Sequence, residues 1–225
     1  MRLQRPGVRT RLRAGARRLK ETPHWFVLRR LGKRRPPDYR EYLATQLRRT
    51  LSKRETDPGA GAVALINRVA EQQRSGGAVL CVGCRNALEL DRFRARGFDD
   101  VVGIDVFSQR DDILVMDMHE MSFPDDSFDV VYASHALEHS YDVERVVREI
   151  ARVARDGAVV GVEVPVRAQA SAADRVVFSG LEELRRVFEP HLWEELLAEE
   201  QPPYTPTNEQ GTDIARLVFR LRKDG

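Results

Sequence analysis

The sequence has few cysteines and no long apolar run. Its 225 residues include two cysteines, Cys81 and Cys84, which are too few for a disulfide scaffold, so a reducing, cytoplasmic setting is expected. The pair has C-x-x-C spacing, but two thiols cannot complete a four-ligand zinc site, and Cys81 falls in an apolar run typical of a buried strand. No apolar run approaches the roughly 20 residues of a membrane span, which predicts a soluble protein without a transmembrane segment.

Acidic residues are scarce at the start of the chain. Residues 1–54 hold 18 Lys and Arg residues against three acidic residues, whereas the remainder holds 19 basic against 32 acidic residues. Such a basic segment predicts contact with nucleic acid or with an anionic surface. A transit peptide and a solvated tail are alternative interpretations. We therefore expect a basic extension, partly disordered or helical, over residues 1–57 and a folded domain over residues 58–225.

Two helices are expected within the extension, over residues 23–31 and 38–54. Apolar side chains recur in the second at steps of three and four residues. They are Tyr39, Tyr42, Leu43, Leu47 and Leu51. Two interpretations of these helices stay open, because they either form a lid over the ligand-binding edge of the domain or only cover its sheet.

The stretch from Ala78 to Asp105 organises the folded domain. Residues 78–82 form a short apolar run rich in β-branched side chains, as in a strand buried on both faces. A turn at Gly83 leads into an amphipathic helix, and a second buried strand ends on Asp105. In a right-handed βαβ unit this turn and the second strand tip lie side by side at the carboxyl edge of the sheet. The Asp105 carboxylate is then placed to accept hydrogen bonds from both ribose hydroxyls, which predicts a nucleoside site.

Glycine is missing from part of this turn. A dinucleotide fingerprint requires glycine at positions 83, 85 and 88, and the S-adenosylmethionine turn requires it near positions 83, 85 and 87. The chain has Gly83, but Arg85, Ala87 and Leu88 occupy the other positions. The glycine pattern alone therefore does not choose between the two cofactor classes.

The remainder of the domain continues the alternation of strands and helices. Strands are expected over residues 113–117, 128–133 and 158–166, with a helix that Asp142 caps before the last of them. A helix over residues 181–188, a sixth strand over residues 191–197 and a seventh over residues 214–221 follow. The loop over residues 201–212 is too rich in proline and polar residues to be regular. The order predicts an α/β fold.

Four segments carry a resemblance to a known family. They are VLCVGCRNA at the first turn, VVGIDV at the second strand, DMHEMSFPDDSFDVVYASHALEH across the third and fourth strands, and VREIARVARDGAVVGVEVP after them. Residues 79–165 look like a class I S-adenosylmethionine-dependent methyltransferase of the type 11 family. The resemblance implies a three-layer, Rossmann-like sandwich with a mostly parallel seven-stranded sheet, in which the last strand runs antiparallel beside the fifth. It also implies S-adenosyl-L-methionine as the methyl donor.

The resemblance implies which residues would hold the donor. They are Cys81, Gly83, Cys84, Arg85, Asp105, Val106, Asp117, Met118 and Ser134. Asp105 would hold the ribose, Asp117 would accept a hydrogen bond from the adenine amine, and Met118 would pack on the adenine. Cys81 stands where family members carry an acid, and Arg85 stands where they carry glycine, which puts the affinity for the cofactor in question.

Methyl transfer is an in-line displacement, so the enzyme has to align donor and acceptor. A general base helps where the acceptor must lose a proton, and His135 and His139 are the candidates because histidine titrates near neutral pH. A structural role is the alternative for both. The expected acceptor is a small molecule, although the sequence names neither the acceptor nor an oligomeric state. The other interpretations are a degenerate domain that binds without catalysis and a nucleic-acid methyltransferase that uses residues 1–54.

Overall fold

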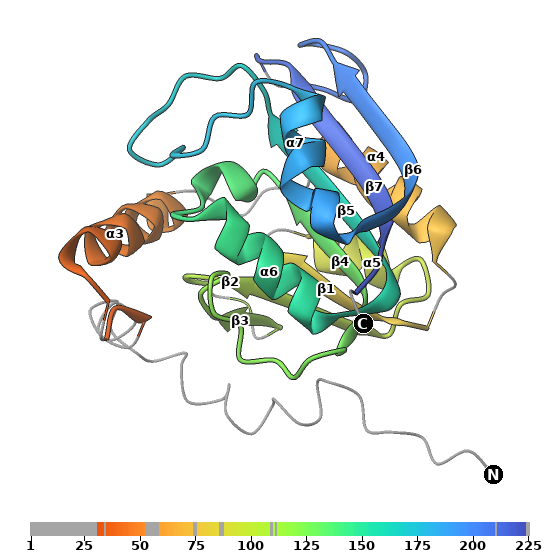
Figure 1. Ribbon diagram of the computed structural model, residues 1–225, viewed down its shortest axis with the longest axis horizontal. Helices are drawn as coiled ribbons and strands as arrows, with labels where there is room; N and C mark the ends of the chain where they lie inside the picture. The colour runs from red at the N-terminus through yellow and green to blue at the C-terminus, as the bar shows by residue number, and fades with distance from the viewer. Residues whose placement is uncertain are drawn as a thin grey trace.

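The computed structural model describes residues 31–33, 35–52, 59–73, 76–85, 88–108, 110, 112–209 and 211–223. Within them, seven strands form one sheet in the order β3-β2-β1-β4-β5-β7-β6 (Figure 1). The strands are β1 (Ala78–Val82), β2 (Asp100–Asp105), β3 (Ile113–Val115), β4 (Phe128–Ser134), β5 (Ala154–Pro165), β6 (Leu192–Gln201) and β7 (Ile214–Leu221). Strands β1 to β5 pair in parallel, whereas β7 runs antiparallel to both β5 and β6. The predicted fold class is confirmed.

Helices cover both faces of the sheet. On one face, α6 (Val143–Val153) and α7 (Leu181–Phe188) belong to the same apolar cluster as the alternate residues Leu80 and Val82 of β1. On the other face, α4 (Ala60–Gln72) and α5 (Glu89–Arg94) belong to the cluster that holds Val79 and Cys81. All five residues of β1 are buried, because successive side chains of a strand point to opposite faces and both faces carry helices. This burial explains the uninterrupted apolar run in the sequence.

Helix α3 (Pro37–Ser52) packs at the carboxyl end of the strands instead of on a face of the sheet (Figure 1). Its Gln46 side chain donates a hydrogen bond to the Ala173 carbonyl at 2.8 Å, which joins the helix to the loop between β5 and α7. The expected helix over residues 23–31 and most of the basic segment lie outside the described residues. So does the expected domain boundary at residue 57, which stays a prediction.

Strand β5 begins earlier than the apolar pattern predicts. The sequence indicates a helix to about residue 155 and a strand from residue 158, whereas α6 ends at Val153 and β5 begins at Ala154. Ala154 pairs with Phe128, and a register shift before the next pair accommodates the intervening residues, including Gly157 with a φ of 76°. Pairing with β4 therefore continues the strand through a polar segment.

Strand β6 forms despite its glutamates. It pairs with β7 along residues 192–201, a longer strand than the sequence indicates, and most of its side chains are at least partly exposed. Cross-strand pairing at the edge of the sheet here outweighs the helix propensity of glutamate. In the part of the chain that the structure describes, no helix combines the length and the apolar character needed to cross a membrane.

Candidate active site

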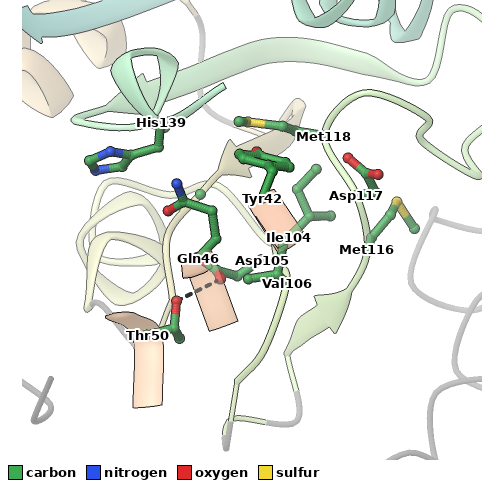
Figure 2. A pocket seen from close by; sticks show the side chains of 12 residues that line it. Tyr42, Gln46, Thr50, Ile104, Asp105, Val106, Met116, Asp117, Met118 and His139 are labelled. Carbon is green, nitrogen blue, oxygen red and sulfur yellow. Dashed lines mark hydrogen bonds between the residues drawn. The ribbon is translucent and has the colours of Figure 1, made fainter. Parts of the chain in front are cut away.

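A pocket of about 450 Å³ lies at the carboxyl ends of the strands (Figure 2). We call it the strand-tip pocket. The predicted site residues that line it are Gly83, Asp105, Val106, Asp117, Met118 and His139. Its remaining strand and loop walls are apolar, with Ile104, Met116 and Ala136. The structure thus brings five of the nine predicted cofactor-binding residues to one cavity.

Helix α3 supplies one wall of this pocket. Tyr42, Gln46 and Thr50 follow one another at four-residue steps and therefore form a single stripe along the helix, which faces the cavity (Figure 2). Thr50 lies 3.5 Å from Oδ1 of Asp105, as donor to that carboxylate. The helical periodicity of the sequence indicated Tyr42 but not Gln46 or Thr50, because polar residues carry no signal of burial.

Gly83 and Asp105 connect the first turn to the tip of β2. Gly83 has a φ of 70°, and a Cβ atom built on it would lie 2.6 Å from Cβ of Ala136, so glycine is required there. The Arg85 amide donates to Oδ2 of Asp105 at 2.8 Å. Burial raises the pKa of Asp105 to about 6, against the opposing effect of the Phe107 and Arg85 amides.

Asp117 lines the pocket, but its carboxylate is already bound within the protein. Oδ1 accepts from the amide of His119 at 2.9 Å and lies 2.7 Å from Nδ1 of the same residue, while Oδ2 accepts from the Tyr39 hydroxyl at 2.7 Å. Burial opposes its charge, yet these donors keep the pKa of Asp117 below its usual range. The resemblance implied a carboxylate available to adenine, whereas this one has little capacity left.

The cysteine side chains face away from the pocket. Cys81 and Cys84 are free, buried and packed in the cluster beneath α4 and α5. The Cys84 thiol lies 3.7 Å from the Ile104 carbonyl, and a side chain at Gly103 would collide with its sulfur. Burial raises the pKa of both thiols, which makes them inert. Among the described residues, no cluster of His, Cys, Asp and Glu is suited to hold a metal ion.

A second cavity of about 620 Å³ adjoins the first. We call it the loop pocket, because the loop between β5 and α7 forms much of its wall. His139 lines both cavities, and Arg49, His135, Glu138 and Asp174 line the loop pocket alone. Neither Arg49 nor Asp174 was predicted, since they lie far apart in the sequence on a helix and an irregular loop.

His135 is held between two carboxylates. Its Nδ1 lies 3.4 Å from Oε1 of Glu138, and its Nε2 lies 3.3 Å from Oε1 of Glu163. Burial disfavours the charged ring, but the bonds to the two glutamates outweigh it and raise the pKa of His135 to about 10. The imidazole is therefore protonated at neutral pH and cannot act as a base.

His139 has the opposite character. Its Nδ1 lies 2.8 Å from Oδ1 of Asp174 and 3.2 Å from the Ala173 carbonyl, and two acceptors at one nitrogen require that this nitrogen carries the proton. Burial lowers the pKa of His139 below its usual value, assisted by the Arg49 charge. Its buried Nε2 lies 3.7 Å from Oε1 of Glu138, beyond hydrogen-bond distance. Neither this nitrogen nor Oε2 of Glu138 has a hydrogen-bond partner among the described residues.

Ser134 does not line the strand-tip pocket. Its hydroxyl donates to Oε1 of Glu163 at 2.9 Å, and the other Glu163 oxygen is bound by the Arg216 guanidinium. Glu163 and Arg216 are each 1% exposed, so this is a buried ion pair between β5 and β7. Nothing in the sequence indicates it, because an isolated charge in an apolar strand has no identifiable partner.

The strand order, the antiparallel β7 beside β5 and the carboxylate at the tip of β2 define the class I methyltransferase fold. Residues 80–162 match the methyltransferase domain family. The chain therefore contains a methyltransferase domain, and the family expected from the sequence is confirmed.

Among the relatives is the 27-O-demethylrifamycin SV methyltransferase of Amycolatopsis mediterranei. It is 33% identical over 100 residues, which cover 37% of this chain and 37% of that protein. The chain spans 12% to 40% of the lengths of the curated relatives it matches. The sequence relationship is thus confined to part of each relative.

Solved structures share the fold at low sequence identity. The 1,6-didemethyltoxoflavin-N1-methyltransferase of Burkholderia thailandensis, solved with 1,6-didemethyltoxoflavin and S-adenosylhomocysteine, superposes with a TM-score of 0.61 and 13% identity over 90% of this chain and 91% of that one. The cyclase SpnF superposes with a TM-score of 0.57 and 20% identity over 72% of this chain and 82% of that one. These likenesses establish the fold alone.

Proposed function

We propose that the protein is an S-adenosylmethionine-dependent methyltransferase that acts on a hydroxyl or amine of a small molecule. The observation that carries the proposal is the position of His139. It lines both the strand-tip pocket and the loop pocket, and its buried Nε2 makes no hydrogen bond within the part of the chain that the structure describes. A donor in the first cavity and an acceptor in the second would then meet beside a neutral imidazole.

The residues of the strand-tip pocket fit the adenosyl donor. The Asp105 carboxylate suits a ribose, and Ile104, Val106, Met116 and Met118 supply apolar walls for an adenine ring. Gly83 lets the first turn lie close against Ala136. When bound, the cofactor supplies an electrophilic methyl group on a sulfonium. The residues that line the pocket thus agree with the cofactor that the family uses, although the Asp117 carboxylate is bound mainly within the protein.

Three polar residues of the loop pocket have different proposed roles in proton transfer. His139 is the proposed general base, since it is neutral and its free nitrogen accepts a proton from the acceptor group. Asp174 is a positioning residue that holds the proton on Nδ1, and the Ser171 hydroxyl donates to it at 2.8 Å. His135 keeps a positive charge between its two glutamates and takes no proton.

A small-molecule acceptor is supported by the names of two similar proteins. One is named for a rifamycin derivative and the other for a toxoflavin derivative. A cytoplasmic setting is also proposed, and the two free, buried thiols support it.

The alternative is a domain that binds a nucleoside or another ligand without methyl transfer. SpnF has the same fold but is named a [4+2]-cyclase and not a methyltransferase. Arg85 in place of a glycine and Cys81 in place of an acid favour this alternative. Contact of residues 1–54 with nucleic acid also stays a prediction. Binding to RNA or DNA that weakens steeply with salt, and is lost on deletion of residues 1–36, would support it.

Isothermal titration with S-adenosylhomocysteine tests the proposed function. We expect binding to the full chain, a large loss of affinity in Asp105→Asn, and no loss in Asp99→Asn, an exposed acid before β2. Since Asp105 has a pKa of about 6 and must be ionised to accept from both hydroxyls, affinity should fall as the pH drops below 6. Absence of heat at millimolar ligand would refute a functional cofactor site.

A further inference from the structure

Arg49 is a cation that lines the loop pocket. It lies in the last turn of α3, half-buried, and its guanidinium makes no hydrogen bond or ion pair with any residue that the structure describes. It follows Tyr42 by seven residues, two turns along, and therefore points to the same side of the helix but into the neighbouring cavity. A half-buried guanidinium left unpaired is costly, because its charge has lost part of its hydration.

The acids around Arg49 are committed elsewhere. Asp174 faces His139 and Ser171, and Oε1 of Glu138 faces His135. Burial and the nearby Arg85 charge lower the pKa of Arg49, and the attraction of Asp174, Glu138 and Asp105 does not offset them. Acids therefore lie near the guanidinium of Arg49, but none of their carboxylates pairs with it.

The position of Arg49 also indicates which substrate it serves. It lines the loop pocket, which is the proposed site of the acceptor, and not the strand-tip pocket, which is the proposed site of the adenosyl group. Two buried atoms of residues that line this pocket, Nε2 of His139 and Oε2 of Glu138, have no partner among the described residues and accept hydrogen bonds. The residues that line the loop pocket thus include both unpartnered hydrogen-bond acceptors and a cation.

We propose that the loop pocket takes an acceptor that carries an oxyanion, a carboxylate or a phosphate, bound by Arg49, together with a hydroxyl or amine that faces His139. The inference rests on the proposed function and specifies its substrate class. The planar guanidinium matches a carboxylate or phosphate through paired N–H donors. Pro165, Ala168, Val176 and Val177 add apolar surface to the same cavity.

The test is a ligand-observed NMR screen of the full chain saturated with S-adenosylhomocysteine. The library consists of matched sets of hydroxy- and amino-substituted fragments, each made as carboxylate, primary amide and phosphonate. We expect anionic members to bind at least tenfold more often than their amides. Preference for carboxylate or for phosphonate distinguishes the two sources of the oxyanion. Equal binding of amides and anions, or binding of no fragment, would overturn the inference.

Two substitutions on α3 form a matched pair. Arg49→Gln should abolish the preference for anions, whereas Arg48→Gln should keep it, because Arg48 is exposed and its side chain donates to Thr45. Both remove one positive charge from the same helix turn. If both variants lose the preference, it arises from overall charge and the inference fails. Affinity for S-adenosylhomocysteine, measured in each variant, reports separately on the proposed function.

Discussion

The Nδ1 atom of His139 lies 2.8 Å from Oδ1 of Asp174, and the two residues belong to segments 35 positions apart. The first, on the short helix η1 (Leu137–His139), follows β4, whereas the second lies in the loop after β5. Their contact fixes which ring nitrogen of His139 carries the proton and leaves Nε2 as the acceptor. The chemistry that we propose depends on this arrangement.

Loss of the proposed base should affect turnover more than cofactor binding. His139→Gln is expected to lower kcat by ~10²–10⁴-fold, the usual contribution of a positioned general base, while its affinity for S-adenosylhomocysteine changes little. His135→Gln should cost less kcat, because His135 is protonated at neutral pH. Steady-state kinetics with radiolabelled donor measures both. Full activity in His139→Gln would show that His139 is not the general base.

The pH dependence of kcat should identify Asp174 as a positioning residue. The base form of His139 exists above its pKa, which burial holds below 6.5, so kcat should be flat through neutral pH and fall only at lower pH. Asp174→Asn removes a charge that favours the protonated ring of His139. The pH at which kcat begins to fall should therefore move lower, and the constant kcat at higher pH should decrease. A lower kcat at neutral pH without a change in the pH at which kcat falls would indicate that Asp174 has a structural role only. Measurement at saturating donor avoids interference from Asp105.

The buried pair of Glu163 and Arg216 should be essential to stability only as a pair. Arg216→Met leaves the buried Glu163 carboxylate with the His135 ring as its remaining cationic neighbour and should lower the free energy of unfolding by about 3 kcal/mol. The double variant Glu163→Leu, Arg216→Met should recover most of this loss. Arg68→Met, which breaks an exposed pair with Glu71, should change stability by less than about 1 kcal/mol. Urea unfolding measures all three. No recovery in the double variant would contradict the account.

The requirement for glycine at position 83 has two separable causes, backbone conformation and space. Gly157 has a similar φ, 76°, but no described residue lies within 4 Å of the position that a Cβ atom would take, so Gly157→Ala should cost about 1 kcal/mol from conformation alone. Gly83→Ala should cost about 1–3 kcal/mol more, because it collides with Ala136. Adding Ala136→Gly should restore that difference. Equal losses at positions 83 and 157 in thermal unfolding would show that the collision is relieved.

The strands of the sheet were predictable because burial on both faces leaves a continuous apolar run. The runs over residues 78–82 and 101–104 correspond to β1 and β2, and the acid after the second run, Asp105, lies in the strand-tip pocket. The start of β5 was misjudged because pairing with Phe128, and not side-chain character, extends that strand.

The loop pocket was predictable only in part. His135 and His139 lie beside each other in a motif, and local sequence indicated them. Arg49 and Asp174 come from distant segments without periodicity, and only the folded chain brings them to the same cavity. The different protonation of the two histidines was also beyond the sequence, since it depends on which carboxylates the fold places beside each ring.

Strand β7 separates β6 from the rest of the sheet. During synthesis on the ribosome, residues 192–201 emerge before residues 214–221, so β6 has no neighbouring strand while it leaves the exit tunnel. At that stage Glu163 also lacks its guanidinium partner from β7. Strand β6 therefore joins the sheet only together with β7 or after it, because β7 supplies the pairing of β6 within the described residues.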